Sequence, residues 1–337
     1  MRPKAIRYAL FFPFLCIMPL TLFHKGFKPT SQIAVLLGVW GACFIAAALA
    51  SAAILLLSGM PLGDSKALFS AEHAGTIRLM QAVSTMFIFG LPAVLYAFIC
   101  FRNGWQVLGV QNSWSWKLAG LAVVAILATG PLTDALGELN KAIPLPGTWK
   151  AYFDTMEENY EQQVKVMLDI RSIGGLLISL LLMAALPALF EELFFRGGLQ
   201  GLFTRWWRSP WVAIVVTAFL FSAIHFSWYG FFPRVMLGIV LGAVYYATGN
   251  LWYSILMHFV NNAAAVIYMY VLQQQGKPID ISQSSMFPAW MGVISAVFIA
   301  WVLYKLVQDR QPEIAEERPA YATDPFSQAE KIDIGNS

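Results

Sequence analysis

Eight stretches of this chain are apolar and long enough to cross a membrane, and they limit the fold more than any other feature. They cover approximately residues 33–57, 77–101, 118–136, 173–190, 211–227, 231–247, 251–272 and 287–306, and the fourth continues in more polar form to residue 203. A helix needs about 20 such residues to span the hydrocarbon core. Charged residues make up only 12% of the 337 residues and hydrophobic residues 58%, an unusual balance for a soluble protein. The sequence therefore predicts an all-α fold, a polytopic bundle of about eight transmembrane helices.

The flanking segments differ in composition from this body. Residues 1–32 are basic and contain a short apolar run, Tyr8–Phe23, which includes two prolines. Residues 309–337 are acidic and polar, and we expect them to be a disordered tail. The sequence thus divides into an N-terminal segment (1–32), a transmembrane domain (33–308) and a tail.

The distribution of Lys and Arg predicts the orientation. With eight spans and a cytoplasmic N-terminus, 13 of these residues fall inside and eight outside. If Tyr8–Phe23 also spanned, the count would change to 10 inside and 11 outside. The positive-inside rule therefore favours eight spans with both termini in the cytoplasm. We expect an integral membrane protein that contacts lipid; its basic body suits an anionic leaflet and gives no evidence for nucleic acid.

The loop at residues 137–172 contains a helical pattern, at about residues 149–170, after the turn signal Pro144–Gly147. Aromatic and aliphatic residues share one face, and acidic residues share the other. The apolar face comprises Trp149, Tyr152, Phe153, Met156, Tyr160, Met167 and Ile170, and the polar face comprises Asp154, Glu157, Glu158, Glu161 and Lys165. We expect an amphipathic helix that either lies on the membrane surface or covers a functional site.

Ionisable residues inside apolar runs are the strongest pointers to function in so uncharged a chain. A charge at the bilayer centre costs about 2.5–3.5 kcal/mol on insertion scales. Glu192 and Arg196 are four residues apart, on one helix face, and can neutralise each other. Glu191 lies about 100° around the helix, so it must face a different partner. Alternatively, these three charged residues mark only the end of a helix at the cytoplasmic interface, where Glu and Arg are common.

Two further polar groups occur on other predicted helices. His225 ends one apolar run, and His258 lies within another, with Asn262 one turn later and Asn261 nearly on the same face. Taken singly, His225 is explained as a core histidine whose nitrogens are hydrogen-bonded, and His258 with its asparagines is explained by hydrogen bonds between helices. The spacings Gly197–Gly201 and Gly238–Gly242 allow helices to approach closely, which would bring these groups together.

A carboxylate, two imidazoles and an amide are the parts of a hydrolytic site. The carboxylate can take a proton from water, and imidazole and amide donors can stabilise an oxyanion. A Glu and two His could instead bind zinc, but neither HExxH nor a nearby cysteine supports a metal site. The sequence contains no motif that would indicate a Ser or Cys nucleophile. The residues therefore favour metal-free hydrolysis without a cofactor.

The three motifs resemble those of the CPBP family, intramembrane glutamic endopeptidases that include type II CAAX prenyl endopeptidases, lysostaphin-resistance proteins and abortive-infection proteins. The resemblance covers about residues 173–267. It implies that Glu191 is the general base and that His225 helps to bind and polarise the water. It also implies that His258 and Asn262 form the oxyanion hole, with Glu192 and Arg196 as a supporting pair.

The expected function is therefore endoproteolysis of a membrane-associated peptide or protein. The alternatives are a non-catalytic immunity or scaffold protein of the same fold, a zinc-dependent membrane protease, and an ion-coupled transporter that uses Glu191 as a proton carrier. The transporter would require inverted repeats, which the sequence does not show. The substrate and any role of prenylation do not follow from the sequence.

Overall fold

The computed structural model describes residues 27–59, 71–168, 170, 172–277 and 287–308. Within these ranges the helices form all of the regular structure and there is no strand, as predicted. The run at Tyr8–Phe23 and the acidic tail lie outside the described residues. Seven helical stretches in the described part are long and apolar enough to span a membrane, and they comprise residues 29–57, 74–100, 116–142, 173–207, 231–248, 251–274 and 289–308.

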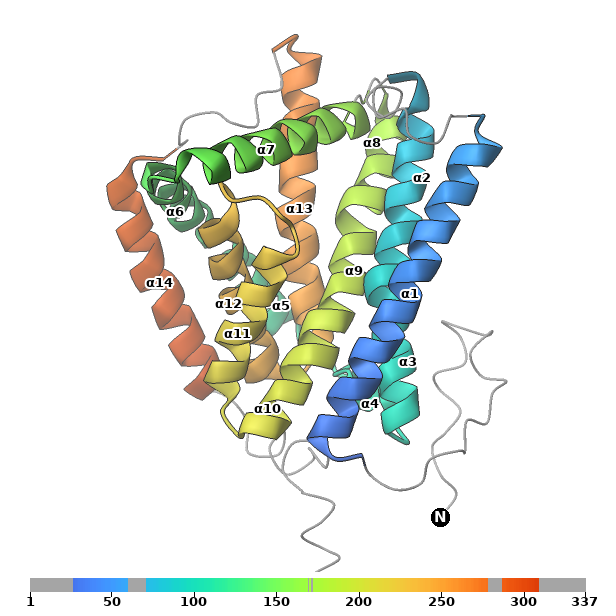
Figure 1. Cartoon of the computed structure of the whole chain (residues 1–337). Coiled ribbons are helices and arrows are strands. Elements are labelled where there is room, and N and C mark those ends of the chain that lie inside the picture. The colour runs from blue at the N-terminus through green and yellow to red at the C-terminus, as the bar shows by residue number, and fades with distance from the viewer. Residues whose placement is uncertain (1–26, 60–70, 169, 171, 278–286, 309–337) are drawn as a thin grey trace, which may run out of the picture.

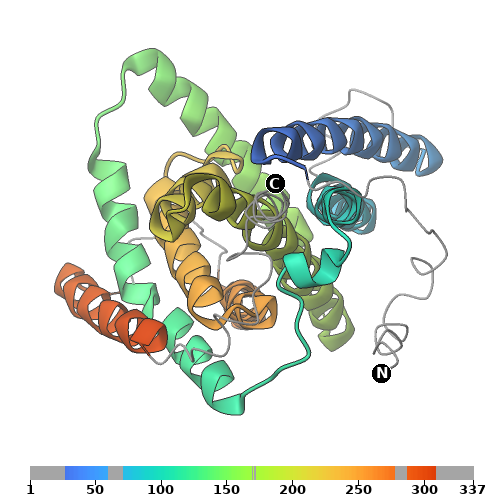
Figure 2. The same ribbon diagram turned by 90° about the horizontal axis from the view of Figure 1, so that it is seen from below.

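Several spans consist of consecutive helical segments. In chain order, the helices are α1 (Pro29–Leu57), α2 (Ala74–Thr85), α3 (Leu91–Cys100), α4 (Gly104–Val107), α5 (Trp116–Ala128), α6 (Gly130–Ala142), α7 (Gly147–Met167), α8 (Ile173–Ser179), α9 (Leu186–Glu192), α10 (Gly201–Trp207), α11 (Pro210–Ala223), α12 (Phe231–Thr248), α13 (Leu251–Gln274) and α14 (Ala289–Gln308). A short 3₁₀ turn, Ala71–His73, precedes α2. Seen along the bundle, α1 and α14 lie on opposite sides (Figure 2).

The eighth expected span is a shorter helix. The apolar run predicted at residues 211–227 forms α11, which has 14 residues and ends at Ala223. The chain then turns, and Phe226 adopts a left-handed backbone conformation with φ of 50°. The last residues of the run therefore belong to the connection between α11 and α12, residues 224–230, and not to a helix.

Prolines explain why two of the spans change helix type. Pro92 and Pro187 lie within long helices, where each removes a hydrogen-bond donor and collides with the preceding turn. A π-helical segment comes before each proline, at Met86–Gly90 and Leu180–Ala185 respectively. Local π turns re-satisfy backbone groups that a proline leaves unpaired, so the spans continue.

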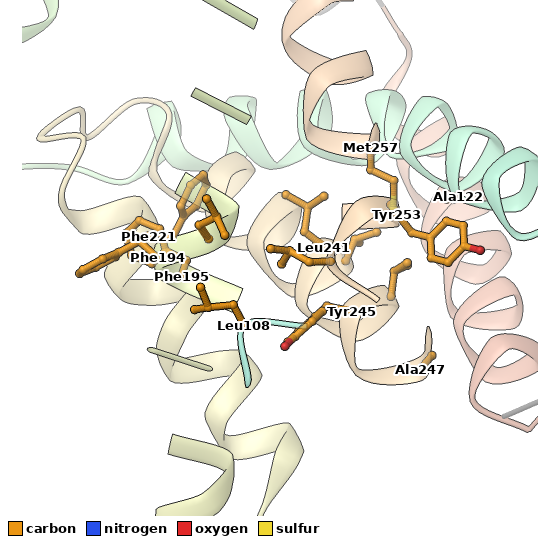
Figure 3. Close-up of a cluster of buried hydrophobic side chains, with 14 of the residues drawn as sticks. Leu108, Ala122, Phe194, Phe195, Phe221, Leu241, Tyr245, Ala247, Tyr253 and Met257 are labelled. Carbon is orange, nitrogen blue, oxygen red and sulfur yellow. The ribbon is translucent and has the colours of Figure 1, made fainter. Parts of the chain in front are cut away.

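Small residues bring α12 close to its neighbours. A Cβ added to Gly238 would lie 2.8 Å from Cβ of Ala218 on α11, and one added to Gly242 would lie 2.7 Å from Oε1 of Gln200. A Cβ on Gly197 would lie 2.8 Å from the Leu108 carbonyl oxygen. The contacts of Gly238 and Gly242 confirm that this spacing permits close helix approach, whereas Gly197 approaches the backbone of Leu108, just after α4. Figure 3 shows the buried side chains that fill the core around this region, including Phe194, Phe195 and Phe221.

Helix α7 lies across one end of the bundle, above the connection between α11 and α12 (Figure 1). The helix predicted at 149–170 forms as Gly147–Met167. Trp149 and Tyr152 of its apolar face are exposed, whereas Asp154 and Glu157 of its polar face accept hydrogen bonds from the connection. The acidic face finds partners because the connection below it carries hydroxyl groups.

Candidate active site

The polar residues singled out in the sequence come from three places in the bundle. Glu191 and Glu192 end α9, and Arg196 lies in the π-helical segment Leu193–Gln200 that follows. His258 and Asn262 lie on α13, and His225 lies in the connection after α11. A π turn often marks a functional position in a helix. Here it lies directly beside the two carboxylates.

Glu192 accepts hydrogen bonds from three side chains. Nη1 of Arg196 lies 2.7 Å from its Oε1, which confirms the expected pair across one helical turn. From α13, Nδ1 of His258 lies 2.9 Å from the same oxygen, and the Ser254 hydroxyl lies 2.5 Å from Oε2. Glu192 is completely buried, and burying a carboxylate is costly unless donors surround it. This carboxylate therefore joins α9 to α13.

Arg196 is also completely buried, although it carries a full charge. Its Nη2 donates to the Gly238 carbonyl oxygen of α12 over 3.2 Å, and its guanidinium lies 4.8 Å from the ring centroid of Phe221. The close approach of α12 at Gly238 makes the first contact possible. Cation–π contact with a desolvated ring adds a favourable interaction. Arg196 thus links the carboxylate to α11 and α12.

Glu191 has a different environment from its neighbour. It is 9% exposed, and its Oε2 lies 3.9 Å from Nε2 of His258. That separation is longer than a hydrogen bond, so the two side chains do not bond directly. Glu191 was expected to face something other than Arg196, and its carboxylate lies within 4 Å of this imidazole.

His258 lies between the two carboxylates. Its Nδ1 faces Glu192, which is paired with Arg196 and accepts hydrogen bonds, so Nδ1 carries a proton and donates. Its Nε2 points toward Glu191. The pairing with Glu192 therefore fixes the ring orientation and directs one nitrogen to the side of Glu191.

His225 is connected to this group through Phe221. Its Nδ1 lies 2.7 Å from the Phe221 carbonyl oxygen and donates to it, which leaves Nε2 as the second nitrogen. The Phe221 ring makes edge contacts with both histidine rings, with centroids 5.0 Å from His225 and 5.8 Å from His258. The two imidazoles thus flank one aromatic ring.

Asn262 lies one turn beyond His258 on α13, as the spacing predicts. Its Oδ1 accepts a hydrogen bond of 3.2 Å from Nδ2 of Asn261. This contact directs the Asn262 amide oxygen to its neighbour and leaves its NH₂ group as a donor for another acceptor. The hydrogen-bonded cluster on Glu192 does not include Asn262.

Sequence reasoning missed Ser254. It is completely buried, and it lies on the same face of α13 as His258, four residues earlier. A hydroxyl one turn before an intramembrane histidine was a usable signal. In an apolar helix a lone serine commonly bonds to its own backbone, and this explains why it did not stand out.

No group of three or more His, Cys, Asp or Glu residues in the described part of the chain is arranged to hold a metal ion. Of the residues considered as zinc ligands, His258 uses its Nδ1 to bond to Glu192. The free directions, Nε2 of His258 and the carboxylate of Glu191, suit a small molecule held by hydrogen bonds.

Comparison with known proteins gives a family assignment for this part of the chain. Residues 173–264 match the model of a family described as type II CAAX prenyl endopeptidase, Rce1-like. Neither the curated proteins nor the solved structures contain a match. All three polar motifs, from Glu191 to Asn262, fall inside the matched residues. The match over residues 173–264 and the motifs within it support membership of the CPBP family of CAAX-type proteases for this multi-pass membrane protein.

Proposed function

We propose that this protein is an intramembrane glutamic endopeptidase that hydrolyses a peptide bond with a water molecule activated by Glu191. The main support is the difference between the two adjacent carboxylates. Glu192 is occupied by three donors, whereas Glu191 has its carboxylate directed to Nε2 of His258 across 3.9 Å. A water molecule bound beside Glu191 would meet a carboxylate that can take its proton, and Nε2 of His258 would face the carbonyl oxygen of the bond that the water attacks.

In this mechanism, Glu191 takes a proton from the water as the oxygen attacks the peptide carbonyl carbon. The carbonyl oxygen gains negative charge, and two donors stabilise it, the NH₂ group of Asn262 and the Nε2–H of a protonated His258. Glu191 then returns the proton to the leaving nitrogen as the C–N bond breaks. His225 helps to bind and polarise the water.

Glu192 and Arg196 have a supporting role in this proposal. Together with Ser254, Glu192 holds His258 in one orientation and stabilises a positive charge on the ring when it is protonated. A positioned imidazole costs less to use in the transition state than a mobile one. The ion pair itself is neutral, so it adds little net charge to the bundle.

We infer that the substrate is a membrane-associated peptide or protein, since the site lies between spanning helices. The bacterial inner membrane, with both termini in the cytoplasm, is the proposed location. The family's name refers to prenylated C-terminal peptides, and this proposal concerns peptide-bond hydrolysis without requiring a prenyl group.

The variant Glu191→Gln tests the mechanism. Glutamine is nearly isosteric but cannot accept the proton, so cleavage should fall by about 100- to 10,000-fold while the protein stays folded. Membranes that carry the wild type or Glu191→Gln, compared by proteomics, identify the peptides to assay. Glu138→Gln, a change of the same type in an exposed pair with Lys141, is the matched control and should leave cleavage unchanged.

Full activity of Glu191→Gln would eliminate the proposed mechanism. If the wild type cleaves nothing, and His258→Ala and Asn262→Ala only lower the thermal stability in detergent, the polar cluster serves as interhelical contacts in a scaffold or immunity protein. Elemental analysis with a chelator decides the remaining alternative. Stoichiometric zinc that is lost together with activity would establish a metalloprotease.

A further inference from the structure

Three consecutive residues of the connection between α11 and α12 contact α7. The hydroxyl of Ser227 donates to Oε2 of Glu157 over 2.8 Å, and the hydroxyl of Tyr229 donates to Oδ1 of Asp154 over 2.5 Å. Between them, the ring of Trp228 lies 5.7 Å from the ring of Phe153. The same connection carries His225 two residues earlier. Helix α7 therefore binds, through two hydrogen bonds and one ring contact, the segment that contains His225.

The opposite end of α7 is anchored to a different part of the bundle. The Arg78 guanidinium, on α2, donates to the Met167 carbonyl oxygen through two nitrogens, at 2.9 and 2.7 Å. Val166 and Met167 pack against Ile77 in a small buried cluster. Because its C-terminal turn is fixed in this way, α7 can act as a rigid frame for the connection beneath its N-terminal half.

The connection needs such a frame. Phe226, next to His225, has a φ of 50°, a conformation that is unfavourable for an aromatic residue, and its side chain is 69% exposed. A strained backbone persists only where its surroundings hold it. The Ser222 hydroxyl closes the turn locally by donating to the Phe231 carbonyl oxygen, and Arg234 donates to the Ser227 carbonyl oxygen. The contacts with α7 supply the remaining constraint.

We propose that α7 is a positioning element for His225. Asp154, Glu157 and Phe153 of α7 hold residues 227–229, and through them α7 keeps His225 in place. This inference rests on the proposed function, because it assigns α7 a role only in a reaction that uses His225. Helix α7 ends before the residues that match the family model begin. The positioning role is therefore assigned to a helix that lies outside the residues matching the family model.

The first experiment compares two purified variants with the wild type in the cleavage assay. Asp154→Asn/Glu157→Gln weakens both acceptors but keeps the shape of the side chains, and we expect kcat to fall about tenfold with KM nearly unchanged. A displacement of a reacting group by about 1 Å can cost about 100-fold in rate. Glu158→Gln, at an exposed position of the same helix, is the matched control and should match the wild type.

A second comparison separates positioning from a general structural effect. In a His225→Ala background, Asp154→Asn/Glu157→Gln should cause no further loss, because α7 acts through the missing imidazole. A further tenfold loss in that background would overturn the proposal. So would a double variant with wild-type kcat.

Hydrogen exchange gives a readout that does not need a substrate. The amides of His225 and Phe226 donate to the carbonyl oxygens of Ser222 and Ala223. In the double variant, these amides should exchange at least about fivefold faster than in wild type, and amides of α1 should be unchanged; unchanged exchange at His225 and Phe226 would overturn the proposal. If Glu191→Gln remains active, the proposed function fails. If Glu191→Gln is inactive but the α7 variant has normal kcat and exchange, only the positioning role fails.

Discussion

Two polar layers of this protein use similar residues in very different surroundings. The inner layer comprises Glu192, Arg196, Ser254 and His258, and its side chains are at most 4% exposed. The outer layer comprises Asp154, Glu157, Ser227 and Tyr229, and the Asp154 side chain is 37% exposed. Charges interact strongly in a low-dielectric interior and weakly near water. We therefore expect the inner layer to govern stability and the outer layer to govern geometry.

The largest expected effect on stability is that of Arg196→Met, which would leave Glu192 buried without its cation. Removing one partner of a buried pair costs about 3–5 kcal/mol in free energy of unfolding. Denaturation in detergent, followed by circular dichroism, measures the loss. Lys165→Met is the matched control in the outer part of the molecule, because it breaks the exposed pair with Glu161 at the same spacing. That change should cost about 0.3–0.5 kcal/mol. Equal losses for the two variants would show that the two environments do not differ as described.

A smaller effect is expected where α12 approaches the inner layer. A Cβ on Gly238 would lie 2.8 Å from Cβ and 3.0 Å from Cα of Ala218, so the helices must separate. Gly238→Ala should lower the free energy of unfolding by about 1–3 kcal/mol. Gly41→Ala provides the control, since nothing lies within 4 Å of the added atom. If Gly238→Ala were as well tolerated as Gly41→Ala, close packing would not be what holds Arg196 against α12.

The smallest effect on stability concerns pH and the outer layer. The hydrogen bond from Lys150, followed by that from Tyr229, holds the pKa of Asp154 below its ordinary value of 3.8. A lowered pKa means that the stabilisation is present above pH 3.8 and is lost as the pH falls through the lower, folded value. The difference in Tm between wild type and Asp154→Asn should therefore shrink below about pH 4. A Tm difference that stayed constant down to pH 2 would argue against this contact.

Local patterns predicted much of this structure. The apolar runs located the seven spanning stretches to within a few residues, except where 118–136 continues through Ala142, because helix length and apolar content must match the bilayer. The Glu192–Arg196 pair was predictable since its residues are one helical turn apart. The end of α11 at Ala223 was not. There, the apolar run continues to residue 227, but Ser222 closes a turn with Phe231 and α7 holds the residues that follow.

The sequence by itself located most of the helices, the few charges within apolar helices, and the motifs that these residues form. Only the tertiary structure decided how those charges are shared. Glu192 and its partners Ser254 and His258 are more than 60 residues apart, as are Glu157 and Ser227. Such contacts depend on how helices cross and how closely their backbones approach. A run of apolar residues predicts that a helix is buried in lipid, but it does not specify which neighbouring helix each of its polar side chains will meet.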